Sequence, residues 1–505
     1  MNQTNPNQQI LTLSRFMKRY ALFMGALFLT LLSNAQGANQ ALIDITVQET
    51  AKAGNDLDNW TVNDASRVFY VAPGANGSGT SINDPMSMDQ AFSANQVQGG
   101  DWYWVKAGDY GMKNYDLSNL DTDATRFNPI AWVGYRTTPG DIVSQPYGGF
   151  NTAPNTNGKH SNPMANLPTN SVGHHILDSS LMPTITGNQG NAPDYLDNDY
   201  AFQSDGGEEG YIFKNFQVQF MAAGWFIKNP KYWLFDNVVS AHMGNFQDIE
   251  GQGGSNQELR GEGIQFEKNG PAGNNCVVKN SFFAQHAIKA LSFSEGEYNL
   301  AVDVACYSDI NNGNPQDYYF HTTGKYNQFL RVRAIRNINS RHSGHGICFN
   351  YGSEHNMSQD SYIYGTSFHF DASHACLSKD NVIVKEQDWC QYITNDPEGN
   401  NSLCYSGGGY AVMDDANHNM VDGGRYSGAG FLDSQKHSRP GHTNVESAGH
   451  NNTFKNAIIT DLGDSVFSYG NWSGDTPAFD NLIFNNILEG ATLMDVARPN
   501  SGLVF

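Results

Sequence analysis

Positive charge is scarce in this sequence. Its 505 residues include 29 Lys and Arg against 50 Asp and Glu, which gives a formal net charge of −21 at pH 7. A phosphate backbone demands a basic face, so we expect no nucleic acid among the partners. Acidity of this kind keeps an exported protein soluble. An anionic glycan is still permitted, because a local cluster of Arg, His and Lys or a bound divalent cation can reverse the sign within a groove.

Long apolar runs are equally rare. The stretch Ala21–Leu32 has twelve residues, too few to span a bilayer, and no other segment is apolar enough to do so. It follows three basic residues and precedes the small residues Ser33-Asn34-Ala35, which is the order of an export signal. We therefore predict a signal peptide over residues 1–35 and a secreted protein, extracellular or periplasmic, without membrane contact after cleavage. A membrane anchor is the alternative.

Cysteine is limited to six residues, and none of them form a CxxC pair, which argues against a structural zinc site. Export makes disulfides possible. Cys390 and Cys404 flank a polar loop that a bridge could close. Cys348 and Cys376 are 28 residues apart, close to one repeat, and could equally be stacked core thiols.

A short phrase recurs through the chain, in which apolar residues precede an Asn or Asp and another apolar pair follows. It occurs at Ile212–Phe216, Leu234–Val239, Val277–Phe283, Thr453–Ile459 and Ile483–Leu488. Asn215 and Asn237 are 22 residues apart, and Asn456 and Asn486 are 30 apart. Repeats of this period, together with 52 glycines for tight turns, indicate a solenoid whose coils bury their apolar faces by stacking. The low charged fraction of 16% and the aromatic fraction of 12% argue against disorder.

Strands with alternating inward apolar and outward polar residues are expected to line one groove. We place them at Ile264–Glu267, Leu291–Glu295, Tyr318–His321, Ile347–Asn350, Cys376–Asp380, Ala411–Asp415, Phe431–Ser434 and Val466–Tyr469. Between Gly148 and Asp199 the pattern lapses into Asn, Pro and Gly, which predicts a long excursion at the edge of this groove. Such a groove suits an extended polymer.

The N-terminal part resembles a known group of enzymes. Phe69–Pro73, Asp84-Pro85 and Gly100–Tyr110 look like the opening of secreted right-handed parallel β-helix enzymes, the pectate-lyase-like polysaccharide lyases and glycoside hydrolases, and Asn128–Tyr135 is similar to their next coil. The resemblance implies an all-β, single-stranded right-handed parallel β-helix with an N-terminal cap and long groove-edge loops. We expect a linker or cap over residues 36–65 and a catalytic domain over residues 66–505. The fold hosts many chemistries.

The densest polar cluster is Ser340–Gly346. His can exchange protons near neutral pH, and Arg can clamp a carboxylate or sulfate. We expect His345 or Lys379 to act as base, with His342 nearby and Arg341 as the neutralising group. Neighbouring coils should add substrate-binding residues, namely Tyr319, His321, His374 and Asp380. The alternative is a structural His-rich turn in which Arg341 pairs with a carboxylate.

Two acidic clusters offer other chemistry. Asp414 and Asp415, with Asp433 on the next coil, could serve as acid and base in glycoside hydrolysis, or they could be solvated turns or calcium ligands. Asp433 and Lys436 are also expected to bind substrate. Gly344-His345-Gly346 with this Asp pair resembles two motifs of polygalacturonase-type hydrolases, although the order is reversed and their Asn-Thr-Asp element is absent. A Gly-rich loop is flanked by possible Ca²⁺ ligands, namely Asp248, Glu250 and Glu262.

Three functions are consistent with these features. A lyase would cleave a uronate-containing or sulfated anionic polysaccharide by β-elimination, and we favour it slightly. A glycoside hydrolase would use the Asp residues, and a non-catalytic glycan-binding solenoid would need neither set. We expect a monomer.

Overall fold

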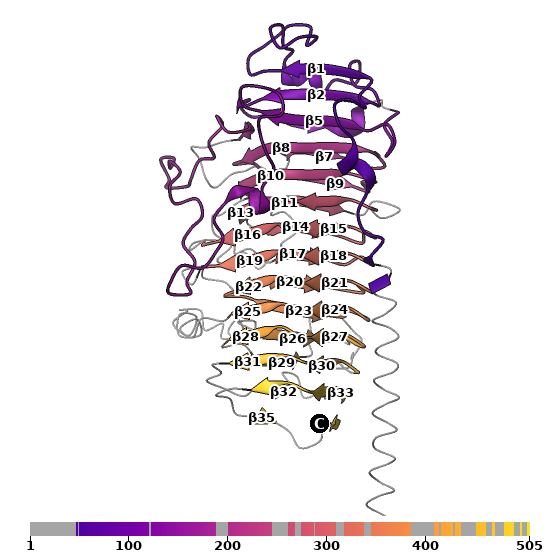
Figure 1. Ribbon diagram of the computed structural model, residues 1–505, viewed down its shortest axis with the longest axis vertical. Helices are drawn as coiled ribbons and strands as arrows, with labels where there is room; N and C mark the ends of the chain where they lie inside the picture. The colour runs from indigo at the N-terminus through magenta and orange to yellow at the C-terminus, as the bar shows by residue number, and fades with distance from the viewer. Residues whose placement is uncertain are drawn as a thin grey trace, which may run out of the picture.

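The computed structural model shows strands stacked along one long axis, with the N-terminal strands at one end and the C-terminus at the other (Figure 1). It describes residues 47–48, 50–120, 123–187, 200–244, 261–267, 274–286, 288–309, 318–337, 345–384, 409–413, 416–427, 430–435, 451–460, 467–469, 479–488, 495–496 and 502–504. Cys390 and Cys404 lie outside these residues. Among the residues described, no helix is both long and apolar enough to cross a membrane.

The described strands form a 24-stranded and a 12-stranded sheet, and neighbouring strands pair in parallel. A typical coil contains three strands, one in each of three series. The first series is β1 (Arg67–Val71), β2 (Asp101–Lys106), β5 (Ile130–Tyr135), β8 (Tyr211–Gln219), β10 (Leu234–Met243), β12 (Val277–Lys279), β15 (Leu300–Val302), β18 (Gln328–Leu330), β21 (Met357–Gln359), β24 (Leu377–Lys379), β27 (Met420–Asp422), β30 (Thr453–Lys455), β33 (Phe479–Phe484) and β36 (Gly502–Val504).

The long strands β8 and β10 continue into the second series. Its other members are β3 (Gly108–Asp109), β6 (Pro183–Thr186), β13 (Phe282–His286), β16 (Ala305–Ser308), β19 (Arg333–Arg336), β22 (Tyr362–Tyr364), β25 (Val382–Val384), β28 (Arg425–Ser427), β31 (Ile458–Thr460) and β34 (Ile487–Leu488). The third series is the 12-stranded sheet, made of β4 (Tyr115–Asp116), β7 (Tyr200–Ser204), β9 (Ala223–Lys228), β11 (Glu262–Glu267), β14 (Lys289–Phe293), β17 (Tyr318–Thr322), β20 (His345–Phe349), β23 (Ser367–Asp371), β26 (Gly409–Met413), β29 (Gly430–Gln435), β32 (Phe467–Tyr469) and β35 (Asp495–Val496).

This arrangement is a parallel β-helix, as the sequence predicted. The described helical turns are short, namely η1 (Asp56–Asn59), α2 (Met88–Ala91), η2 (Leu117–Asn119) and η3 (Pro146–Gly149). Ser87 caps α2 by accepting a hydrogen bond from the Gln90 N–H, while the Gln90 side chain accepts from the Ser87 N–H.

The recurring asparagine makes the corner between the first and second series. Asn215, Asn237, Asn280 and Asn456 have φ of 61°, 57°, 50° and 60°. Asn tolerates this left-handed conformation because its short side chain can bond locally. Asn237 Nδ2 donates to Asn215 Oδ1 at 2.8 Å, so successive corners are also linked. In the last phrase the corner residue is Asn485, with φ of 54°.

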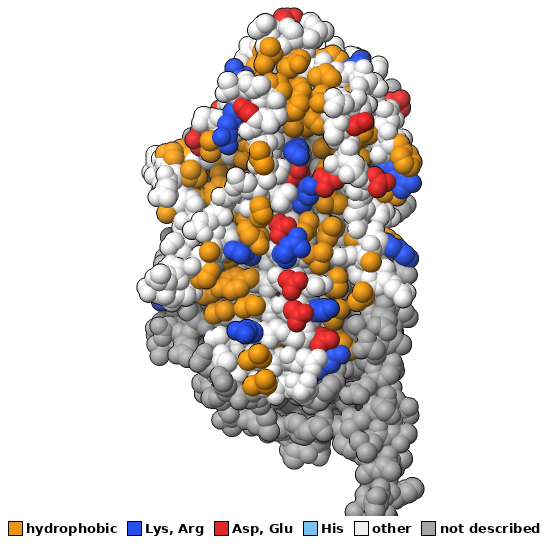
Figure 2. All heavy atoms as spheres, viewed as in Figure 1, with side chains coloured by type: hydrophobic (Ala, Val, Ile, Leu, Met, Phe, Trp, Pro, Cys, Tyr) orange, Lys and Arg blue, Asp and Glu red, His pale blue; other side chains and the backbone are white. Residues whose placement is uncertain are grey.

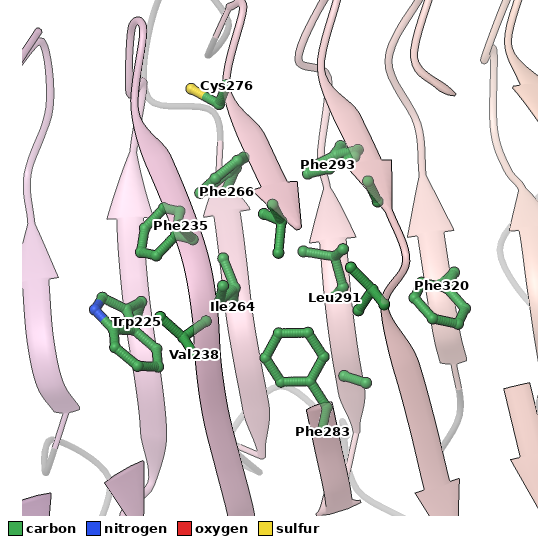
Figure 3. Close-up of a cluster of buried hydrophobic side chains, with 14 of the residues drawn as sticks. Trp225, Phe235, Val238, Ile264, Phe266, Cys276, Phe283, Leu291, Phe293 and Phe320 are labelled. Atoms are coloured by element: carbon green, nitrogen blue, oxygen red, sulfur yellow. The ribbon is translucent and has the colours of Figure 1, made fainter. Parts of the chain in front are cut away.

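The interior is a stack of aromatic and aliphatic side chains from all three series (Figure 3). The rings of Phe235 and Phe266 lie 5.9 Å apart, those of Phe266 and Phe293 5.5 Å, and those of Phe293 and Phe329 5.5 Å. Full burial of such a side chain stabilises by about 1.5–3 kcal/mol relative to exposure. The free thiol of Cys376 belongs to this core, and that of Cys348 is buried on the third series.

A column of charged side chains runs along the molecule with apolar side chains on both sides of it (Figure 2). It includes the ion pairs Lys214–Asp236 at 2.9 Å, Arg331–Asp303 at 2.7 Å and Lys455–Asp422 at 3.3 Å. These residues lie at or beside the corner between the first two series. The Arg331–Asp303 pair is partly exposed, and surface pairs of this kind stabilise by at most about 1 kcal/mol. Asp236, by contrast, is buried.

Two N-terminal segments cover outer faces of the helix. Leu57 packs on the first series with Trp102 and Trp104. The excursion between β5 and β6 packs on the second series, where the rings of Phe150 and Phe282 lie 4.1 Å apart. A small apolar cluster lies on the third series and consists of Tyr200, Ala222, Ala223 and Phe226; in the part of the chain that is described, neither N-terminal segment belongs to it.

Acidification is expected to loosen this excursion at His160. Its Nε2 lies 3.0 Å from the Tyr362 hydroxyl and its ring centroid 4.6 Å from that of Tyr364. Burial, with a smaller contribution from the charge of Arg333, lowers the pKa of His160 to about 4. The docked segment therefore favours the neutral ring, so its stabilisation is present above pH 6.5 and is lost as the pH falls toward 4.

Hydrogen-exchange protection factors for residues 147–164, compared at pH 7 and pH 5, measure this effect. The fall in protection should be smaller in His160→Phe, which keeps the ring but cannot be protonated. An equal fall in both proteins would contradict the assignment.

Candidate functional site

The outward side of β11, β14, β17, β20 and β23 carries two ladders of polar side chains, which we call the histidine face. Ile264, Leu291, Phe320, Ile347 and Phe368 on these strands point into the core. The residues that directly follow them therefore point outward. At the start of these strands the alternation breaks, because Ala290 and Tyr319 also pack into the core, and the residues before them form a second outward row. One ladder, in register across the strands, is Gln265, Ser292, His321, Cys348 and His369, and the other is Glu262, Lys289, Tyr318, His345 and Ser367. Neighbouring strands lie about 4.8 Å apart, so each ladder forms a continuous row.

His345 is held by a hydrogen bond to the next coil. Its Nδ1 lies 3.0 Å from His369 Nε2, and His369 Nε2 lies 2.5 Å from Ser367 Oγ. A hydrogen bond between two ring nitrogens requires that one of them carries no proton, so the pair is poised to pass a proton. The ring of Tyr318 lies 5.1 Å from that of His345, on the preceding strand. A phenol and an imidazole therefore meet at the centre of the face.

Gly346, next to His345, is required by packing inside the helix. A Cβ at this position would lie 2.8 Å from Thr366 Cγ2 and 2.9 Å from Ile363 Cγ2. The absence of a side chain at this position therefore has a steric reason in the interior of the β-helix.

A second hydrogen-bonded chain ends at Tyr318. Ser292 Oγ lies 2.9 Å from His321 Nδ1, and Asn350 Nδ2 lies 3.3 Å from both His321 Nε2 and the Tyr318 hydroxyl. Burial, with smaller contributions from the charges of Lys289 and His345, holds the pKa of His321 well below its usual range. His321 is therefore neutral at physiological pH, with one nitrogen that donates and one that accepts.

Glu262 is the one predicted calcium ligand that the structure describes. It is buried, and its Oε2 accepts a hydrogen bond from the Gly261 N–H at 2.8 Å. Asp248 and Glu250 lie outside the described residues. Within those residues, no group of three or more His, Cys, Asp or Glu side chains could hold a metal ion. The calcium site stays a prediction.

Tyr319 requires a correction. The sequence placed it among the substrate-binding residues, but its side chain is buried in the core cluster and lies near Ser308 and Arg336. The outward residue is its neighbour Tyr318. Inward and outward residues do not alternate at this end of the strand, because Tyr319 and Phe320 both pack into the core.

Lys379 and Asp380 also require a correction. Lys379 lies on β24 in the 24-stranded sheet, in register with Gln359 and Asp422, and is exposed. Asp380 follows it at the corner between the first and second series, with φ of 51°. Neither lies on the sheet that carries His345, so the expected convergence of these residues is not observed.

His374 lies beyond the end of β23, in the turn toward the first series. Its Nδ1 is 2.5 Å from Asn417 Oδ1, and its ring lies between those of His355 and His418. This column of turn side chains is separate from the two ladders of the histidine face. The expected role of His374 in the same site is therefore not supported.

Several predicted site residues are not described, namely Arg341, His342, Asp414, Asp415 and Lys436. Asp433 lies on β29, whose backbone extends the ladder that includes His369 through Ala411 of β26. The structure adds residues that the sequence did not single out, namely Gln265, Lys289, Ser292 and Asn350. In the sequence, each ladder residue lies a fixed number of positions from the inward apolar residue of its strand. This spacing is the feature by which the ladder residues could have been found.

Comparisons with known proteins add little to this description. No protein-family model matches the sequence. No curated protein matches it either. Solved structures that match include a mannuronic acid-specific family 6 polysaccharide lyase from human gut microbiota, at 12% identity and a TM-score of 0.40, covering 86% of this chain and 83% of that one. A family 136 lacto-N-biosidase from Eubacterium ramulus matches at 11% and 0.42, covering 84% and 68%, and a pectate lyase at 14% and 0.35, covering 79% and 76%. At these values the similarity concerns the β-helix fold and carries no argument about activity.

Proposed function

We propose that this protein is a secreted enzyme that cleaves an anionic, uronate-containing polysaccharide by β-elimination. The observation that supports this best is the contact between Tyr318 and His345 on the histidine face, with Lys289 one strand earlier in the same ladder. Elimination needs a group that neutralises the uronate carboxylate, a base that removes the proton beside it, and an acid that protonates the leaving oxygen. This ladder offers one side chain of each kind.

The roles follow from the chemistry of each side chain. Lys289 places an ammonium group beside the Tyr and His residues, where it can pair with the substrate carboxylate. His345 is the base, because imidazole accepts a proton near neutral pH, and the hydrogen bond to His369 fixes its ring. Tyr318 is the acid that protonates the departing glycosidic oxygen. Asn350 donates to the Tyr318 oxygen and so favours the phenolate that remains.

Hydrolysis is less well supported by the described residues. A glycosidase needs two carboxyl groups roughly 5–9.5 Å apart. Glu262 and Glu267 stand at opposite ends of β11, about 16 Å apart along the strand. Asp371 lies on β23, four strand spacings or about 19 Å from β11. Asp414 and Asp415 lie outside the residues that the structure describes. Hydrolysis is therefore the second activity that the substrate screen must be able to detect.

The test is a substrate screen with the exported protein on alginate, pectate, chondroitin sulfate, fucoidan and carrageenans. Ultraviolet absorbance reports the unsaturated ends of elimination, and a reducing-end assay reports any cleavage. Reducing ends without absorbance would show hydrolysis, and no products would favour a binding protein. Each assay is run with calcium and with a chelator, which tests the expected calcium dependence separately.

Replacing Lys289 by Gln is expected to lower kcat/KM on the cleaved polysaccharide about 10–100-fold. A charge-assisted contact contributes about 1.5–3 kcal/mol, and each 1.4 kcal/mol is tenfold. Lys379→Gln is the matched control, because it removes the same charge from another sheet and should leave kcat/KM unchanged. Equal losses in both variants would show that general charge, not this site, is responsible.

A further inference from the structure

Two amide side chains on the histidine face each hold an oxygen without a hydrogen-bond partner. Gln265 Nε2 donates to Ser294 Oγ at 3.0 Å, while Gln265 Oε1 has no partner. Asn350 Nδ2 bonds to Tyr318 and His321, while Asn350 Oδ1 has none. Each residue is only 3% exposed. A buried acceptor left unpaired costs about 1–3 kcal/mol, so two of them on one face require an explanation.

Both amides belong to one chain of hydrogen bonds that reaches Tyr318. From Gln265 the chain passes to Ser294, and Ser294 Oγ lies 3.2 Å from Ser292 Oγ. It continues from Ser292 to His321 and Asn350. The chain fixes the orientation of each amide, so the open oxygens are positioned rather than mobile. It extends from β11 to the end of β20, three strand spacings or about 14 Å.

The chemistry of this chain differs from that of the Lys289 ladder. Its members are amides, hydroxyls and a histidine that burial keeps neutral. A carboxylate or sulfate would meet two acceptor oxygens here and would be repelled. A hydroxyl group can donate to each of them and remove the cost of the unpaired oxygen.

We propose that Gln265 Oε1 and Asn350 Oδ1 accept hydrogen bonds from hydroxyl groups of two different sugar units of one polysaccharide chain. This inference rests on the proposed function and names the part of the substrate that the site reads. Asn350, beside Tyr318, contacts the unit at the point of cleavage. Gln265, three strand spacings or about 14 Å from Asn350 along the stack, contacts a more distant unit. The enzyme thus recognises the position of sugar hydroxyl groups at Gln265 and Asn350. It recognises the carboxylate of the substrate at Lys289.

The experiment uses Gln265→Leu, which keeps a similar volume and removes the acceptor. We expect this protein to be at least as stable as the wild type, because replacing an unpaired buried polar group by an apolar one removes its cost. KM for long oligosaccharides of the cleaved polysaccharide should rise about five- to tenfold, with kcat within twofold. The shortest cleavable oligosaccharide, which does not reach Gln265, should be cleaved equally by both proteins. The control Gln359→Leu, on β21 of the other sheet, should match the wild type at every length.

Titration calorimetry with the same oligosaccharides and the inactive His345→Ala background separates binding from turnover. An equal loss of affinity at all lengths would overturn the inference, since a distant subsite cannot affect a short ligand. Unchanged KM and affinity in Gln265→Leu would also overturn it and leave the proposed function intact. Affinity that depends on Gln265 in a protein that cleaves no polysaccharide would instead overturn the proposed function and keep the hydroxyl site.

Discussion

The variant His345→Ala is expected to lose at least 100-fold in kcat on the polysaccharide that the wild type cleaves. General acid–base catalysis by a positioned side chain contributes about 10²–10⁴-fold, and His345 is the proposed base. The substitution removes a half-buried ring from the outer face, while the inward residue Ile347 keeps its place in the core. The melting temperature should therefore change by only a few degrees. The measurement is the initial rate of absorbance at saturating substrate, together with a thermal melt.

Two other histidine variants test whether the expected loss of activity is specific to His345. His369→Gln keeps a hydrogen-bonding side chain next to His345 Nδ1, so it should lower kcat less than the alanine variant and shift the pH dependence of kcat. His355→Ala is the matched control, because the His355 ring belongs to the column of turn side chains away from the histidine face. It stacks on the Tyr326 ring, with 5.1 Å between the two centroids. His355→Ala should retain full activity. A fully active His345→Ala protein would exclude His345 as the base.

Local patterns predicted several strands of the third series well because these strands share an apolar–polar–apolar core. Ile264-Gln265-Phe266 on β11 and Ile347-Cys348-Phe349 on β20 both show it, and both strands occur where the sequence placed them. The interpretation of Cys376–Asp380 as another groove strand is wrong. The coil between Met357 and Leu377, which pair in register, spans only 20 residues, so its groove strand, β23, comes earlier, at Ser367–Asp371.

Site residues were harder to predict because their grouping depends on register between coils. His345 and His321 stood out locally, as His residues beside glycines or aromatics. Lys289 has no local signal, and only its pairing with Tyr318 places it on the histidine face. The choice of Tyr319 over Tyr318 failed because strict alternation was assumed at the end of a strand, where both Tyr319 and Phe320 turn inward.

Asparagine also acts inside the helix, where a second ladder satisfies buried backbone groups. Asn327 Oδ1 accepts from the Asn299 N–H at 2.9 Å, and the Asn327 N–H donates to Asn356 Oδ1 at 2.8 Å. Asn327 Nδ2 donates to the Gly296 carbonyl at 2.8 Å and to Thr322 Oγ1 at 3.0 Å. Each amide therefore closes the turn of one coil and links it to the next.

The variant Asn327→Leu is expected to lower the free energy of unfolding by about 1–3 kcal/mol. It removes the acceptor of the buried Asn299 N–H, while the Gly296 carbonyl keeps the hydrogen bond from the Lys325 N–H. Denaturant unfolding followed by circular dichroism measures the change. Asn119→Leu is the control, because the Asn119 bond to Asp116 is exposed, and its effect should stay within about 0.5 kcal/mol. A loss below 1 kcal/mol for Asn327→Leu would show that other groups or water satisfy the turn.

The position of the coils that Asn327→Leu destabilises is as informative as the decrease in the free energy of unfolding. In a solenoid, stability is a sum of coil and interface contributions, so the damage should concentrate in coils next to the substitution. Hydrogen-exchange protection should fall most in β15, β18 and β21 and least in β1 and β2. Because Asn327 also bonds to Thr322 at the end of β17, the same variant should disturb the strand that carries Tyr318 and His321. An Asn327→Leu protein that is destabilised locally and loses activity, while Asn119→Leu does neither, would show that the interior asparagine ladder positions the outer site.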